Sequence, residues 1–310
     1  MSARLAITHA GGPLAEALLE QLQESGVAPD SLVLLDREER IGNRIAYGDS
    51  YLSLEDQQAF DFEDLSGVLL LEQDAELADL LQHAECPVIS HLPLSVDAPL
   101  FVPGREQELP DRGFIKLPAA DVATVLPVVR ALQQGFGLTA LHLVSVLSAM
   151  HLGQAGVDDL AAQTIGLLNS RDIEAGVFPQ PLAFNLLPLP GPDTGELRRL
   201  IGDEAPPLGH QQLLAPAFHG LAIAVSADLN NPAEIDQVSR KLADTGFRIS
   251  DQAVSPRSHC QQGSACWIGH LQQPEGDPAR LQFWLVADSV RNGWLAFYRS
   301  AADFLLKSVL

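Results

Sequence analysis

The first third of the chain alternates between short apolar runs and a helix-spaced pattern. Arg4–Thr8 and Ser31–Asp36 are apolar runs of strand length, and between them a turn over His9–Ala15 leads into a helix that stops at Ser25-Gly26. The leucines that recur on one face of this helix are Leu14, Leu18, Leu19 and Leu22. The order strand, glycine turn, helix, strand is how a dinucleotide-binding βαβ unit begins.

The same alternation continues as far as residue 121. A helix is predicted over Ala75–His83, and the further strands are predicted over Gly67–Glu72, Pro87–Ser90, Leu100–Pro103 and Phe114–Leu117. Strands that alternate with helices form a doubly wound parallel sheet. We therefore predict an α/β domain of the Rossmann type over residues 1–121, which the last segment, 288–310, joins as the helix Ser289–Leu310.

The chain between these segments has a different pattern. Leu138–Ala149 is an apolar strand without a charged residue, and Gly156–Leu168 has the spacing of an amphipathic helix. A proline-rich connection spans Val177–Pro192, and helices are predicted after Asp193 and from an N-cap at Asn231. The remaining predicted strands are Leu221–Leu229, Ile249–Val254, Cys266–His270 and Leu281–Ala287. Residues 122–287 are therefore predicted to form an α+β domain with a mostly antiparallel or mixed sheet.

The stretch around Pro118 is where chemistry is expected. Pro118 ends the strand Phe114–Leu117, and Asp121 can accept hydrogen bonds from the N–H groups that open the helix Val122–Gln134. A strand that leads into a helix N-terminus offers oriented donors and a positive dipole, which favour a thiolate or a bound anion. The residues at this bend are Ala119 and Ala120, and alanine can be neither a nucleophile nor an acid.

Composition and charge limit the partners. A net charge of −21 argues against nucleic acid and anionic membranes, because both attract basic surfaces. The N-terminus enters a strand at once rather than a signal peptide, and the longest apolar run is too short to span a bilayer. Cys86, Cys260 and Cys266 are widely spaced and odd in number, which is typical of reduced thiols. We expect a cytoplasmic protein.

Histidines and cysteines do not form a convincing metal or catalytic pattern. His259, Cys260, Cys266 and His270 suggest zinc, but their spacing fits no common pattern, so an ordinary loop is favoured and no metal is expected. The role of the Cys260/Cys266 loop stays open. The other histidines have no serine or cysteine partner that the sequence places beside them, so a surface or hydrogen-bonded structural role is expected for each. They are His83, His91, His142, His151, His210 and His219.

The glycine turn departs from a dinucleotide-binding fingerprint. Only the central glycine, Gly12, is kept, while His9 stands at the first position, Ala15 at the last, and Pro13 removes one N–H donor. The candidate cofactor-binding residues are Ala10, Gly11 and Gly12. We interpret them as an inherited turn, so no cofactor is required and NADP would bind weakly.

Six stretches occur in order over most of the chain: Pro99-Leu-Phe-Val-Pro, Leu160-Ala-Ala-Gln-Thr, Leu182-Ala-Phe-Asn-Leu-Leu-Pro, Asp193-Thr-Gly-Glu, Ala215-Pro-Ala-Phe-His-Gly and Phe283-Trp-Leu-Val-Ala-Asp. Together with the N-terminal βαβ unit, they resemble the aspartate-semialdehyde dehydrogenase family, and within it the Usg branch, which has no established activity. The resemblance implies the two domains described above and a homodimer formed through the middle domain.

The resemblance also implies where catalytic residues would stand. In active members a cysteine thiolate attacks the aldehyde, hydride passes to NADP, and phosphate cleaves the acyl-enzyme. The position of the cysteine corresponds to Ala120 here, and that of the glutamine that orients the thiol corresponds to Leu147. The arginine that holds the substrate carboxylate corresponds to Leu214, and the acid/base histidine to Leu221. Shifting the alignment by two residues would bring His219 to the last position.

The asparagine that faces nicotinamide in the family corresponds to Ser289, in the pair Asp288-Ser289. With all four catalytic roles taken by aliphatic side chains, we expect a non-catalytic dimer with a binding or structural role. The alternative is an NADP-linked aldehyde oxidoreductase with altered chemistry, which the survival of His219 and of the turn at Gly12 keeps open. The uncharged strand Leu138–Ala149 favours the same dimer interface as in the family.

Overall fold

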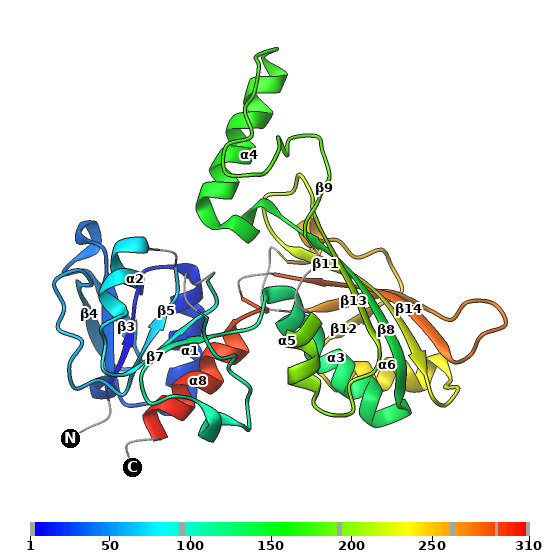
Figure 1. Cartoon of the computed structure of the whole chain (residues 1–310), viewed down its shortest axis with the longest axis horizontal. Helices are drawn as coiled ribbons and strands as arrows, with labels where there is room; N and C mark the ends of the chain where they lie inside the picture. The colour runs from blue at the N-terminus through cyan, green and yellow to red at the C-terminus, as the bar shows by residue number, and fades with distance from the viewer. Residues whose placement is uncertain are drawn as a thin grey trace. The chain divides into compact units, whose positions relative to one another are not determined.

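The structure is a computed structural model of the chain, and it describes residues 4–72, 74–92, 97–190, 194–260, 265–288 and 291–307. The chain divides into two compact units, Met1–Ala119 with Trp294–Leu310, and Ala120–Gly293 (Figure 1). The crossings lie at 119/120 and 293/294 rather than at 121/122 and 287/288. Of the two residues at the expected catalytic bend, Ala119 therefore belongs to the first unit and Ala120 to the second.

The first unit contains the expected doubly wound sheet. Its order is β3-β4-β2-β1-β5-β6-β7, and every pairing is parallel except that of β3 with β4. The strands are β1 (Leu5–Ile7), β2 (Leu32–Asp36), β3 (Arg44–Tyr47), β4 (Ser50–Asp56), β5 (Gly67–Leu70), β6 (Pro87–Ser90) and β7 (Gly113–Lys116). The strand predicted over Leu100–Pro103 is wrong, since this segment makes only a single bridge, from Leu100 to Lys116.

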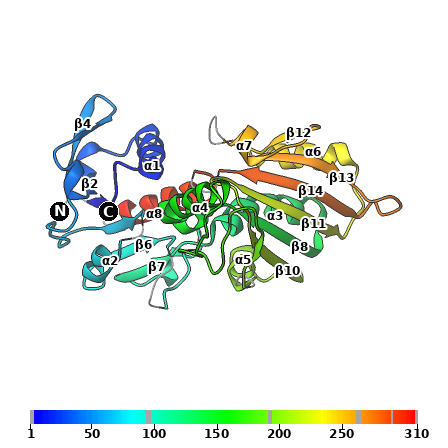
Figure 2. The same ribbon diagram turned by 90° about the horizontal axis from the view of Figure 1, so that it is seen from above.

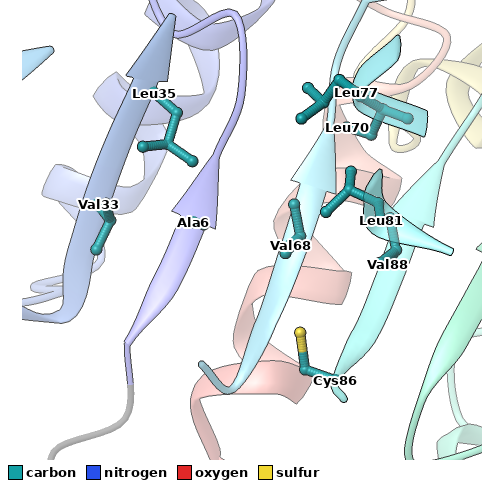
Figure 3. Packing of buried hydrophobic residues seen from close by; sticks show 9 residues of the cluster. All are labelled: Ala6, Val33, Leu35, Val68, Leu70, Leu77, Leu81, Cys86 and Val88. Carbon is teal, nitrogen blue, oxygen red and sulfur yellow. The ribbon is translucent and has the colours of Figure 1, made fainter. Parts of the chain in front are cut away.

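Three helices of the first unit bury leucines: α1 (Pro13–Glu24), α2 (Ala75–Leu81) and α8 (Leu295–Lys307). The 3-10 turns η1 (Pro29–Ser31), η2 (Glu38–Arg40) and η3 (Glu106–Glu108) contain no buried residue. Leu77 and Leu81 of α2 lie against Val68, Leu70 and Val88 in one apolar layer (Figure 3). The helix predicted over Ser289–Leu310 begins only at Leu295, and Ser289 lies outside the described residues.

The second unit contains a mixed sheet, as expected. Its order is β12-β13-β14-β11-β8-β10-β9, with β10 parallel to β8, β12 parallel to β13, and the other pairs antiparallel. The strands are β8 (Leu138–Leu147), β9 (Leu187–Pro188), β10 (Leu208–Leu214), β11 (Leu221–Leu229), β12 (Arg248–Ser250), β13 (Trp267–Gln272) and β14 (Arg280–Ala287). The sequence did not predict β9 and β10.

Helices α3 (Ala120–Phe136), α5 (Thr194–Ile201) and α6 (Ile235–Ala243) contact strands of this sheet, and so does the short helix α7 (Pro256–His259). The view from above shows α6 beside β12 and β13 (Figure 2). The N-cap predicted at Asn231 is wrong: α6 begins after Glu234, and the Asn231 amide instead donates to the carbonyl of Phe136. Short helical turns are η4 (Ala149–Leu152) and α7 (Pro256–His259).

Helix α4 (Gly153–Leu168) is the exception among the long helices, because it extends away from the strands of its own unit (Figure 1). Leu160 is the one large apolar residue that it buries, while Ile165 is 59% and Leu168 is 73% exposed. The predicted apolar face is thus uncovered at its C-terminal end, at Ile165 and Leu168, in the described part of the chain. Within the described residues, no helix has the length and apolarity needed to span a membrane.

Candidate functional site

Three leucines form a continuous row across the second sheet. Leu147 ends β8, and strand pairing places it directly opposite Leu214 of β10 on one side and Leu221 of β11 on the other. Leu214 in turn faces Leu187, and Leu221 faces Ala287, so the row crosses five strands. No member is more than 5% exposed. The positions that the resemblance assigns to a glutamine, an arginine and a histidine are therefore neighbours in the sheet, and the side chains there are core residues.

Ala120 lies close to this row in the fold. It is the first residue of α3 and is 7% exposed, and its carbonyl accepts a hydrogen bond of 2.6 Å from the hydroxyl of Thr124. The next residue, Asp121, accepts a hydrogen bond of 2.8 Å from Nε2 of Gln212, two positions before Leu214. The start of α3 is thereby tied to the end of the sheet that carries the leucines. Methyl and isobutyl groups at these positions can neither attack a carbonyl nor transfer a proton.

Asp121 belongs to a buried polar cluster that the sequence did not predict. Nε2 of His210 lies 3.1 Å from Asp121 Oδ2 and 2.9 Å from the hydroxyl of Ser145. The expectation that His210 lacks a serine partner is wrong. Ser145 lies two residues before Leu147, and His210 lies four before Leu214, so their side chains point to the same face of the sheet as the leucines. Recognising β10 as a strand would therefore have predicted that His210 points inward. Asp121 turns toward β10 instead of only capping α3, although its Oδ1 does accept from the N–H of Val122.

The cluster has the residue types of a catalytic triad but not its geometry. Burial by itself would raise the pKa of Asp121, but the hydrogen bond and charge of His210, with hydrogen bonds from Gln212 and Ser145, lower this pKa to about 2. Because an ionised carboxylate only accepts, Nε2 must carry the imidazole proton. Asp121 and Ser145 thus share one nitrogen, while Nδ1 is buried without a partner among the described residues. A relay needs the two groups on opposite nitrogens, so the cluster holds α3 on the sheet.

In the first unit, the glycine turn uses its own N–H groups internally. Ala10 donates to the carbonyl of Leu35 at 3.0 Å, and Gly12 donates to the carbonyl of His9 at 3.0 Å. Gly11 donates to Oδ2 of Asp36 at 2.7 Å. Proline at position 13 has no N–H to offer. The candidate cofactor-binding residues Ala10, Gly11 and Gly12 therefore already have acceptors within the protein.

Acidic and imidazole side chains surround this turn. A side chain added at Gly12 would meet the Glu72 carboxylate at 2.8 Å. His9 adopts φ 51°, a left-handed conformation that favours glycine, and its Nε2 lies 3.6 Å from Asp74 Oδ2. Burial lowers the pKa of His9, against the opposing effect of Glu72. Arg40 also lies beside the turn, but it is paired with Asp36. A pyrophosphate needs free N–H donors, and those of the turn are engaged, so the residues present do not fit one.

Among the other residues considered from the sequence, Asp288 lies close enough to Cys260 and Cys266 to raise the pKa of both thiols, beside the larger effect of burial. His219 is exposed in the turn before β11, and Asp288 accepts a hydrogen bond from the N–H of Arg291. Cys260 and Cys266 are free thiols whose pKa is raised to about 12, mainly by burial. Among the described residues, no group of three or more histidine, cysteine or carboxylate side chains is placed to hold a metal ion.

Comparisons with known proteins cover the whole chain. The family described as semialdehyde dehydrogenase, dimerisation domain, matches residues 129–292, just over half of the chain. A USG-1 protein homologue of Pseudomonas aeruginosa is 28% identical over 93% of both proteins, and aspartate-semialdehyde dehydrogenase 2 of Vibrio cholerae is 27% identical over 98% of this chain and 97% of its own.

Among solved structures, a probable aspartate-semialdehyde dehydrogenase from Pseudomonas aeruginosa superposes with a TM-score of 0.78 at 27% identity and full coverage of both chains. Aspartate semialdehyde dehydrogenase II from Vibrio cholerae has the same fold, with a TM-score of 0.77 at 23% identity. The chain therefore belongs to the semialdehyde dehydrogenase family, together with relatives named as aspartate-semialdehyde dehydrogenases and as USG-1 proteins.

Proposed function

We propose that this protein is a non-catalytic member of its family that acts as a binding or structural homodimer. The observation that carries the proposal is the row Leu214–Leu147–Leu221, in register across three strands and at most 4% exposed. Aldehyde oxidation through an acyl-enzyme needs a nucleophile, a group that orients it and a proton carrier. A buried aliphatic row beside Ala120 supplies none of these groups.

Burial strengthens this argument beyond a comparison of residue types. A substrate carboxylate brought to Leu214, which is 1% exposed, would lose water and gain no partner. The leucines are packed as core, where each buried apolar side chain contributes about 1.5–3 kcal/mol. We infer that the former substrate site now stabilises the second unit. No cofactor is needed for this role, and the three free thiols suit a reducing compartment such as the cytoplasm.

The proposed dimer uses the sheet face opposite the leucine row. Val144, Ala224 and Trp284 lie in register across β8, β11 and β14, and Trp284 is 39% exposed. A half-exposed tryptophan flanked by small apolar residues is typical of an interface rather than of a free surface. The family model that matches this region is named for dimerisation, which supports the same arrangement here.

The proposed lack of catalysis is tested by assaying purified protein for phosphate-dependent oxidation of aspartate semialdehyde with NADP. The aspartate-semialdehyde dehydrogenase 2 of Vibrio cholerae serves as the positive control. We expect no rate above the protein-free blank. Turnover at even about a thousandth of the control rate, which corresponds to about 4 kcal/mol in barrier height, would show that another residue provides the nucleophile. It would favour the alternative of an NADP-linked oxidoreductase with altered chemistry.

A further inference from the structure

The carboxylate of Asp36 is held by the glycine turn, at the end of the strand where a dinucleotide-binding site places its ribose-binding acid. Asp36 is the last residue of β2, and it is 3% exposed. Its Oδ2 accepts from the N–H of Gly11 at 2.7 Å, and its Oδ1 accepts from the N–H of Arg37 at 2.8 Å. These are charge-assisted hydrogen bonds of the kind that a phosphate oxygen would make with the same donors.

The position of Asp36 gives it two possible relations to a dinucleotide. An acidic residue at the end of the second strand commonly hydrogen-bonds a ribose hydroxyl, and in that role it points at the ligand. Here the carboxylate is instead held by the turn itself, and a side chain added at Gly11 would meet it at 2.8 Å. The atom nearest to such a side chain is Nη1 of Arg40, at 2.6 Å, and Arg40 is paired with Asp36. A ligand that approached Gly11 would therefore have to displace the Arg40–Asp36 pair.

Neighbouring charges reinforce the closure. The Glu72 carboxylate lies over Gly12, so a pyrophosphate on the turn would meet two carboxylates at close range. The nearest cation, Arg40, has its Nη1 3.5 Å from Asp36 Oδ2 and is already engaged there. Displacing Asp36 would therefore cost its hydrogen bond with Gly11 and its ion pair with Arg40 together.

We infer that Asp36 acts as a built-in substitute for the phosphate and closes the turn of the first unit against phosphate-bearing nucleotides such as NADPH. Asp36 is then the residue that keeps the nucleotide out. The turn fails to bind because a carboxylate occupies its donor, and not only because fingerprint glycines have been replaced. This inference rests on residues of the first unit alone, so it is independent of the leucine row in the second. If Asp36 closes the turn, removing its carboxylate should strengthen nucleotide binding. If only the loss of the fingerprint glycines weakens binding, removing the carboxylate should have no such effect.

The experiment is a fluorescence titration of NADPH, with NADH in parallel, against the full-length protein and its variants. Asp36→Ala frees the N–H of Gly11, and Asp36→Asn removes the charge while keeping the side-chain shape. Asp56→Ala is the matched control, because Asp56 pairs with Asp36 on the next strand but its carboxylate accepts from the N–H of Gln58 instead of from the turn. Circular dichroism and a thermal melt verify that each variant is folded.

We expect the unmodified protein and Asp56→Ala to show no saturable binding of either nucleotide below about 1 mM, the weak end of specific affinities. Asp36→Ala should bind NADPH at least tenfold more tightly than the unmodified protein, with Asp36→Asn in between. If the unmodified protein binds NADH or NADPH and Asp36→Ala weakens that binding, Asp36 is a ribose ligand and the inference is overturned. Folded variants that show no gain would overturn it as well. Neither result would bear on the proposed lack of turnover.

Discussion

At the scale of single residues, His9 shows how the glycine turn keeps its shape without its first glycine. Its φ of 51° places Cβ against the following carbonyl, which costs roughly 1–2 kcal/mol for a residue other than glycine. The ring is 2% exposed and lies 3.3 Å from both Thr8 Oγ1 and Gln57 Nε2. The packing of the imidazole therefore offsets the strain of its backbone.

This balance can be measured with two variants that both remove the ring. His9→Gly relieves the left-handed backbone, whereas His9→Ala keeps the strain. We expect both variants to be less stable than the unmodified protein, with the glycine variant about 1 kcal/mol more stable than the alanine variant. Urea unfolding followed by circular dichroism gives the difference. Equal stabilities, or a more stable alanine variant, would show that the turn relaxes out of the left-handed region.

Asp121 gives a second prediction at this scale, on pH. Its pKa is about 2 in the folded protein and about 3.9 in an unfolded chain, so the folded state favours the ionised form. This stabilisation is complete above about pH 5 and is lost as the pH falls from about 4 toward 2; it amounts to about 2 kcal/mol. Asp121→Asn should lower stability at pH 7 and flatten the acid limb of the unfolding free energy below pH 4. An unchanged acid limb in this variant would contradict the assignment.

At the scale of elements, strands β8, β10 and β11 carry the three positions that the resemblance assigns to catalytic side chains, and each is a leucine. Their register brings Leu147, Leu214 and Leu221 together, although they lie up to 74 residues apart (221 − 147). Because three strands contribute to one row, no single substitution can rebuild the site.

Ala120→Cys tests this dependence. A thiol there would stand at the first residue of a 17-residue helix, whose dipole favours a thiolate. We nevertheless expect no phosphate-dependent oxidation of aspartate semialdehyde, because Leu214 cannot bind a carboxylate and Leu221 cannot move a proton. Labelling with a thiol reagent verifies that the new cysteine is present and reactive. An active single variant would mean that other residues cover these roles.

The same elements show what the sequence could and could not predict. β11 was predicted with its observed bounds, Leu221–Leu229, because period-two alternation reports its buried face directly. β10 was missed because Gly209, His210, Gln211 and Gln212 read as polar, although His210 and Gln212 point inward to Asp121. The partner that satisfies them is about 90 residues away in the chain, and no local pattern reports it.

For the candidate site too, the sequence predicts some features and not others. The replacement of catalytic residue types could be read position by position from the resemblance, whereas their alignment in one row is a property of strand register. Closure of the glycine turn by Asp36 could not be predicted, because the acidic residue at the end of the second strand is also what a working site has. The β3–β4 hairpin was missed because its strands are mostly exposed and polar.

At the scale of the whole molecule, the second unit has apolar surface without a partner in this chain. On the sheet face, Trp284 is 39% exposed, and along α4 and the segment after it Phe184 and Leu186 are 71% and 59% exposed. Large apolar side chains exposed on a chain with a net charge of −21 support the proposed association with a second copy.

We expect light scattering at micromolar concentration to report a particle of about twice 33.3 kDa. Trp284→Glu should shift the population toward monomer, because the charge would be buried without a partner in the interface. Tyr51→Glu is the control, since Tyr51 is 69% exposed on β4 of the first unit and should leave the dimer intact. A monodisperse monomer of the unmodified chain would contradict the proposed assembly.

The leucine row has a consequence for the history of this chain as well as for its chemistry. Return to an active enzyme would have to pass through intermediates such as Leu214→Arg, which places a guanidinium at a position that is 1% exposed and whose neighbours are leucines. An unpaired buried charge costs about 3–5 kcal/mol, a large part of the 5–15 kcal/mol that holds a typical domain together. Each single step back is therefore selected against before any activity can reward it. The packing of the row therefore disfavours any route from the proposed non-catalytic state to an active enzyme.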